Sequence, residues 1–131
     1  MARRQAHGPF GLADWMAVIV ACLLISGCGA KTPGDVVQEF EMLIAEGKFE
    51  AAAKHVPSSD REMFMMGAAM AGGFSELFGM GEPRRVEITR EDIYGNEADV
   101  AYVIHYKDGS SSWEEWEHLV KVGGKWRISL Y

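Results

Sequence analysis

Residues 97–130 decide the fold of this chain, and they read EADVAYVIHYKDGSSSWEEWEHLVKVGGKWRISL. Apolar and polar residues alternate through most of this stretch, which is the period of a half-buried strand. Two dipeptides interrupt the alternation, Asp108-Gly109 and Gly123-Gly124. Both favour tight hairpin turns, because their residues tolerate a positive φ. The stretch therefore predicts three antiparallel strands in a row.

The first turn sets the pairing of two of these strands. A two-residue turn at Asp108-Gly109 places Ile104 opposite Trp113. The same register places Tyr102 opposite Glu115, and the second turn aligns the last two strands in the same way. One face of the sheet then gathers apolar side chains, and we expect helices to pack on it. Its members are Val100, Tyr102, Ile104, Trp113, Leu119, Trp126, Ile128 and Leu130.

Residues with the pattern of helices precede the predicted strands in the chain. Thr32-Pro33-Gly34-Asp35 predicts a helix start, with Thr at the N-cap, Pro at N1 and Asp at N3, and Gly47 supplies the stop. A short helix is expected over residues 48–55. Ser59-Asp60-Arg61-Glu62 has the capping-box pattern and opens a third helical segment, which Gly72-Gly73 weakens.

Val86 and Ile88 add a first strand before a turn at Tyr94-Gly95-Asn96. The expected fold class is therefore α+β, with two or three N-terminal helices packed on a four-stranded antiparallel meander sheet. This single domain spans residues 32–131.

Three segments carry a family resemblance: DVVQEF at 35–40, EGKFEAA at 46–52 and LVKVGGKW at 119–126. They resemble the cystatin-like α+β domain of the nuclear-transport-factor-2-like superfamily, and within it small uncharacterised bacterial lipoproteins. The resemblance implies a cone-shaped fold in which the space between sheet and helices can be a pocket. Members include isomerases, dehydratases, carriers and modules without activity, so the fold leaves the function open.

Residues 1–27 have the parts of a signal peptide. Arg3 and Arg4 form a basic start, and an apolar run of 11 residues extends from Trp15 to Ile25. A helix needs about 20 apolar residues to cross a bilayer, so the run is too short for an ordinary permanent span. The alternative is an uncleaved anchor helix in which Cys22 and Cys28 are simply small apolar residues.

Leu24-Ile25-Ser26-Gly27-Cys28 resembles the bacterial lipobox. The resemblance implies cleavage after Gly27, a diacylglycerol on the Cys28 thiol and further acylation, such as palmitate, at the new amino terminus. Residues 28–31 would then be a lipid-anchored tether on the extracytoplasmic side of a bacterial membrane. Gly29, rather than Asp, implies the outer membrane, facing the periplasm, if the cell is Gram-negative.

Cleavage would leave 104 residues with 11 basic and 18 acidic side chains, a net charge of −7. Such a charge argues against a nucleic-acid partner, because a surface of this kind repels phosphate. Cys22 would be discarded and Cys28 acylated, so the domain would have neither a disulfide nor a thiolate metal site. We expect no cofactor.

Two carboxylates are misplaced in the apolar pattern. The register directs Glu115 and Glu117 to the same face as Tyr102. These three residues are candidate pocket residues, and a carboxylate there could have a raised pKa and act as a base on an apolar substrate. The simpler interpretation is that both carboxylates are solvated where the helices leave the sheet uncovered.

On the opposite face, the register aligns Asp99 with His118 and His118 with Ser129. A Ser-His-Asp arrangement would need an activated serine and an oxyanion hole, which a flat strand face does not offer. We therefore expect an ion pair between Asp99 and His118. His105 and Arg127 on this face are ordinary surface groups.

Met63, Met66 and Met70 share one helical face, and Met65 lies nearby. Thioethers favour Cu(I) over harder ions, so these methionines are candidate soft-metal ligands. The simpler interpretation is core packing, because methionine fills irregular space well. A third alternative is that residues 64–80 form an exposed apolar surface that touches a partner or the membrane.

The sequence as a whole predicts a lipid-anchored, extracytoplasmic binding or accessory module without catalytic activity. The alternatives are Cu(I) binding through the methionines and a pocket enzyme that uses Glu115 or Glu117. Its expected partner is the membrane, through acyl chains on Cys28, and its ligand stays open.

Overall fold

A helical half and a sheet follow each other along the chain in the computed structural model, which describes residues 29–78 and 81–131. Side chains are described for residues 29–71 and 81–131. The predicted signal peptide and Cys28 lie outside the described residues. Residues Lys31–Tyr131 form one compact unit.

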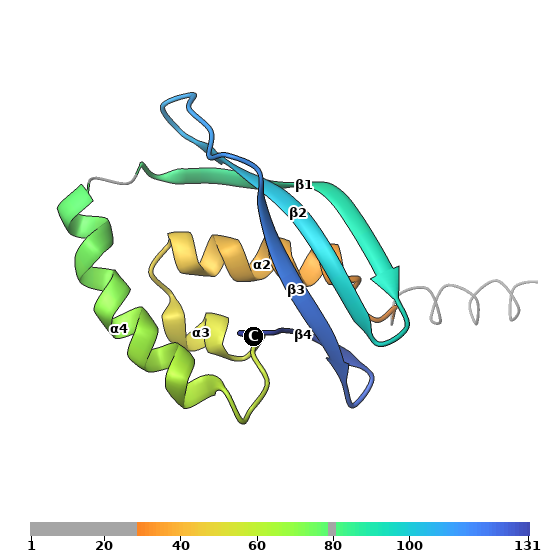
Figure 1. Ribbon diagram of the computed structural model, residues 1–131. Helices are drawn as coiled ribbons and strands as arrows, with labels where there is room; N and C mark the ends of the chain where they lie inside the picture. The colour runs from red at the N-terminus through yellow and green to blue at the C-terminus, as the bar shows by residue number, and fades with distance from the viewer. Residues whose placement is uncertain (1–28, 79–80) are drawn as a thin grey trace, which may run out of the picture. The chain divides into compact units, whose positions relative to one another are not determined.

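Three helices, α2 to α4, and four strands make up the described part of the chain (Figure 1). The helices are α2 Pro33–Ala45, α3 Phe49–Ala53 and α4 Arg61–Phe78. The strands are β1 Pro83–Tyr94, β2 Glu97–Tyr106, β3 Glu115–Val122 and β4 Lys125–Ile128. The sheet is antiparallel with order β1-β2-β3-β4, so the predicted α+β meander is confirmed.

The start of α2 has the predicted capping box. The Thr32 hydroxyl accepts a hydrogen bond from the Asp35 amide at 3.1 Å, and the Asp35 carboxylate accepts one from the Thr32 amide at 3.1 Å. Such a cap stabilises a helix by about 1 kcal/mol. Gly47, with φ of 74°, follows the helix end in the left-handed conformation that glycine favours.

Helix α4 is the predicted third helical segment. It begins at Arg61 and continues through Gly72-Gly73 to Phe78, since two glycines cost a helix only about 1 kcal/mol each and alanine and methionine offset them. The Arg61 guanidinium fixes its start, because Nε donates to the carbonyls of Ala53 at 3.1 Å and Val56 at 3.3 Å.

The sheet curls over α2, which runs along its inner face, while α4 is set off to the side with α3 between them (Figure 1). Register shifts in β1, between Pro83 and Arg85 and between Ile88 and Arg90, bend this long strand. The core gathers between α2, α3 and the sheet. Its fully buried side chains include Val37, Val56, Val86, Val100, Leu119 and Ile128.

One predicted pairing is wrong. Trp113 does not lie opposite Ile104, and its side chain is 90% exposed. The Tyr106 amide donates to the Ser110 carbonyl at 2.9 Å and His105 pairs with Ser111, so the turn has three residues rather than two and ends at Gly109, with φ of 90°.

An extra residue after Ser111 restores the predicted register at Tyr102 and Glu115. Three residues, 112–114, face only two on β2, and such a bulge turns a side chain away from the core face. The second hairpin is as predicted: Leu119 pairs with Ile128, and both Gly123 and Gly124 have positive φ.

Within residues 29–78 and 81–131, no helix combines the length and the apolar character that crossing a bilayer requires.

Candidate functional site

An open pocket of about 540 Å³ lies between α2, α4 and the inner face of the sheet. Its size falls within the range of small-molecule sites, and its walls are mainly apolar and aromatic. The described residues that line it are Phe40, Glu41, Ile44, Phe49, Met63, Phe64, Gly67, Ala68, Ala71, Tyr102, Glu117, Leu130 and Tyr131.

Two acidic side chains from different elements line the pocket. Glu41 comes from α2 and is 7% exposed, and it is the buried charged residue of the described core. Glu117 comes from β3 and is half-buried. The β2–β3 pairing sets Glu117 opposite Val100, next to the pair of Tyr102 and Glu115.

Tyr102 links the pocket to its rim. Its ring is 4% exposed, and its hydroxyl donates to the carboxylate of Glu115 at 3.1 Å. Burial and then the charge of Glu41 raise the pKa of Tyr102 well above its ordinary range, so the hydroxyl stays protonated and remains a donor.

The two pocket acids share a proton near neutral pH. Burial, followed by the negative charge of Glu117, raises the pKa of Glu41 to about 8. Burial also raises the pKa of Glu117, while the hydrogen bond with Glu41 lowers it. Two neighbouring carboxyl groups in a buried site cannot both ionise cheaply, so the pair keeps one proton near neutral pH.

The structure separates the two glutamates that the sequence singled out. Glu115 is exposed at the rim, whereas Glu117 is half-buried in the pocket lining. The simpler interpretation of the sequence, solvation of both, therefore fails for Glu117, which is half-buried and lines the pocket together with Glu41.

Sequence reasoning missed Glu41. The signal was a carboxylate within the apolar stripe of α2, where Val37, Phe40, Glu41 and Ile44 follow helical spacing. A charged residue at such a position faces the core.

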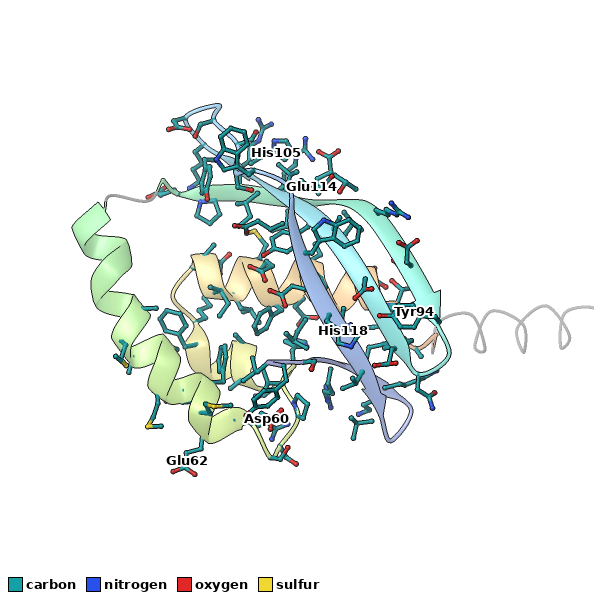
Figure 2. The ribbon with its side chains drawn as sticks, viewed as in Figure 1. Asp60, Glu62, Tyr94, His105, Glu114 and His118 are labelled. Carbon is teal, nitrogen blue, oxygen red and sulfur yellow. The ribbon has the colours of Figure 1, made fainter. Side chains whose placement is uncertain are left out.

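The outer face of the sheet holds the predicted ion pair. His118 Nδ1 lies 2.8 Å from the Asp99 carboxylate, and its Nε2 lies 3.3 Å from that of Glu97. The hydrogen bond to Asp99 raises the pKa of His118. The Tyr94 hydroxyl also donates to Asp99 at 2.8 Å, and Figure 2 shows Tyr94 and His118 lying close together.

The Ser129 hydroxyl is not bonded to His118, so it is not placed as the nucleophile of a triad. It donates to the carbonyl of Tyr131 at 3.1 Å, and the Ser129 amide donates to the carbonyl of His118 at 2.8 Å. His105 lies elsewhere on the outer face, bound to Glu87 at 2.7 Å, and Arg127 is half-buried on β4. Figure 2 shows His105 well apart from His118.

The methionines of α4 are not core residues. Met63, Met66 and Met70 are 42%, 63% and 75% exposed, because the helix turns Phe64 and Ala68 inward instead. Phe64 packs on Phe40 with ring centroids 5.7 Å apart. The core-packing interpretation is therefore wrong for these three methionines. Among the described residues, no cluster of three or more His, Cys, Asp or Glu side chains is arranged to hold a metal ion.

Two solved structures are similar to this chain in fold. One is the crystal structure of a Campylobacter jejuni protein that carries the name NTF2-like transpeptidase, with 14% identity and a TM-score of 0.63, covering 77% of this chain and all of that one. The other is the solution structure of a SEC-C motif containing protein from Rhodopseudomonas palustris, with 15% identity and a TM-score of 0.58, covering 83% of this chain and 84% of that one.

A comparison with curated proteins found no significant match. A family model does match, over residues 26–129, and its description is a domain of unknown function, DUF4878. The match spans well over half of the chain, and the predicted nuclear-transport-factor-2-like fold is confirmed by the first solved structure. This chain therefore belongs to the DUF4878 family and has an NTF2-like fold.

Proposed function

We propose that this domain is a binding module, without catalytic activity of its own, that holds a small and largely apolar ligand in the pocket between α2, α4 and the sheet. The observation that carries the proposal is the pair of Glu41 and Glu117 in the lining of an open apolar pocket. A buried acid pair costs stability, and perturbed carboxyl groups gather where a ligand or substrate is handled.

The residues that line the pocket favour ligand binding over catalysis. Apolar walls supply most of the contact area, and a few polar groups converge at one place, as in ligand sites generally. Among the described side chains, the candidate nucleophile Ser129 lies outside the pocket lining and its hydroxyl is already bonded.

A second candidate function rests on the raised pKa of Glu41. An acid that keeps its proton near neutral pH, beside a carboxylate that accepts one, can move a proton on a bound apolar substrate. Turnover of a bound compound that is lost in Glu41→Gln would favour this alternative.

The predicted location is part of the proposal. The lipobox at residues 24–28 supports an anchor of acyl chains on Cys28, which would hold the pocket at the extracytoplasmic face of a membrane.

Gly67 offers a direct test of the pocket. A Cβ at this lining position would meet no atom within 4 Å, so Gly67→Leu should fill the pocket without a clash. Leucine also has the higher helix propensity, by up to about 1 kcal/mol, so the fold should be at least as stable. Ala69→Leu, at an exposed position of the same helix, is the matched control.

The measurement is calorimetric titration of the full chain in lipid nanodiscs, with empty nanodiscs as the blank. The probes are phenylbutylamine, phenylbutanol and phenylbutyrate, which share one apolar body. Binding of at least one probe to the wild type and to Ala69→Leu, with loss in Gly67→Leu, supports the proposal. Binding that survives Gly67→Leu, or no binding of any probe, contradicts it.

A further inference from the structure

The charges around the pocket have one sign. Glu41 and Glu117 are the charged residues of its described lining, and Glu115 stands at the rim, bound to Tyr102. No lysine, arginine or histidine is among the lining residues that the structure describes. The potential inside such an apolar cleft is therefore negative.

Nearby basic side chains are engaged elsewhere. Arg61 donates to backbone carbonyls at the end of α3, Arg90 lies over the ring of Trp116 at 5.8 Å, and Lys121 lies over the ring of Trp126 at 5.4 Å. None of these groups is in the described pocket lining, so the protein itself supplies no counter-ion there.

We infer that the ligand is a cationic amine with an apolar body, whose ammonium group binds to the carboxyl groups of Glu41 and Glu117. The inference rests on the proposed binding function and specifies its ligand class. An ammonium group is a donor with no acceptor, so it can bond to both carboxylates at once.

The remaining walls suit such a ligand. Phe40, Phe64 and Tyr131 present aromatic rings, and the thioether of Met63 accepts the Tyr131 hydroxyl at 3.5 Å. Aromatic faces attract cations, by about 0.5–2 kcal/mol in measured cases, and they also pack against an apolar body. A carboxylate ligand would instead meet the charge of Glu117, and a neutral one would leave it without a counter-ion.

Binding should also release a proton. The groups that act on Glu41 are Glu117 on β3, Tyr102 on β2 and Glu115 at the rim, and all but the tyrosine are acidic. An ammonium group beside them lowers the pKa of Glu41, which gives up its proton when the amine enters.

The test compares the three phenylbutyl probes on the full chain in nanodiscs, near pH 7. We expect the amine to bind roughly 10- to 100-fold more tightly than the alcohol, the range of a charge-assisted hydrogen bond, and the carboxylate to bind most weakly. Titration in buffers of different ionisation enthalpy should show proton release for the amine alone.

Substitutions of Glu41 and Glu117 test whether these two residues cause the preference for the amine over the alcohol. Glu117→Gln should narrow the preference for the amine, and the double variant Glu41→Gln with Glu117→Gln should bring the amine and the alcohol within about threefold of each other, with proton release lost. Glu114→Gln, an exposed carboxylate outside the pocket lining, should keep the wild-type preference. Thermal unfolding of each variant shows that it is folded.

Two results would overturn the inference. One leaves the proposed binding function intact, and the other contradicts the binding function too. If the alcohol or the carboxylate binds as tightly as the amine, the ligand class is wrong while the binding function stands. If no probe binds, or if binding survives Gly67→Leu, the binding function of this pocket fails as well.

Discussion

At the scale of single residues, the burial of the Glu41 carboxyl group is the main energetic cost of the pocket. Its side chain is 7% exposed, and its neighbours Glu115 and Glu117 are both acidic. Burial and the charge of Glu117 raise its pKa to about 8, so the folded chain avoids the cost of a second buried negative charge near neutral pH. The helical pattern alone could have flagged this carboxylate, but its partner on β3 depends on how the sheet packs against α2.

The protonation of Glu41 predicts how stability depends on pH. Its pKa is raised from the ordinary 4.5 to about 8 in the folded chain, so the folded state binds more protons than the unfolded state between these values. The free energy of unfolding should therefore fall as the pH rises through this window, and level off above it. A raised pKa of this size corresponds to a loss of up to roughly 5 kcal/mol, since one pKa unit corresponds to about 1.4 kcal/mol.

Urea unfolding at a series of pH values, followed by tryptophan fluorescence, measures this loss. Glu41→Gln carries no titrating group at this position, so most of the slope should vanish and the variant should be more stable than the wild type above about pH 8. Glu114→Gln should keep the slope. An equal slope in Glu41→Gln would mean that other groups cause it.

At the scale of elements, the sequence predicted correctly the helix cap and the turn whose interactions lie within a few residues of chain. The capping box at Thr32 and Asp35 lies within four residues of chain, and Gly123-Gly124 specifies its own turn, so both were predicted correctly. Trp113 was not, because a two-residue and a three-residue turn at Asp108-Gly109 are close in energy, and the bulge after Ser111 decides between them.

Helix α4 gives a prediction about its two faces. Met66 and Met70 are 63% and 75% exposed, so replacing either by glutamine should change the free energy of unfolding by less than about 0.5 kcal/mol. Ala68 is 7% exposed on the inner face, where glutamine would place an amide against the apolar walls of the pocket, at a cost of roughly 1–3 kcal/mol. Urea unfolding of the three variants measures the contrast. Equal costs on the two faces would mean that α4 packs differently.

At the scale of the whole molecule, the pocket joins segments far apart in the chain. Residues of α2, α4, β2, β3 and the C-terminal Tyr131 all line it. The register predicted that Tyr102 and Glu117 share a face, and it holds because the bulge after Ser111 compensates for the longer turn at Asp108-Gly109. The enclosure of that face depends on where α2 and α4 cross the sheet, which residue patterns alone do not specify.

The last prediction concerns how the molecule is held at a membrane. Two cysteines occur in the chain, and Cys28 alone follows the lipobox pattern, so Cys28→Ser should abolish labelling by radioactive palmitate in a bacterial host and move the protein out of the lipidated membrane fraction. Each buried CH₂ contributes about 0.8 kcal/mol, so loss of the acyl chains removes stable anchoring. Cys22→Ser, within the apolar run, should keep both the label and the location. Labelling that persists in Cys28→Ser would rule out Cys28 as the acylated residue. A wild type that takes up no palmitate would rule out the anchor and favour the uncleaved helix, in which neither cysteine is acylated.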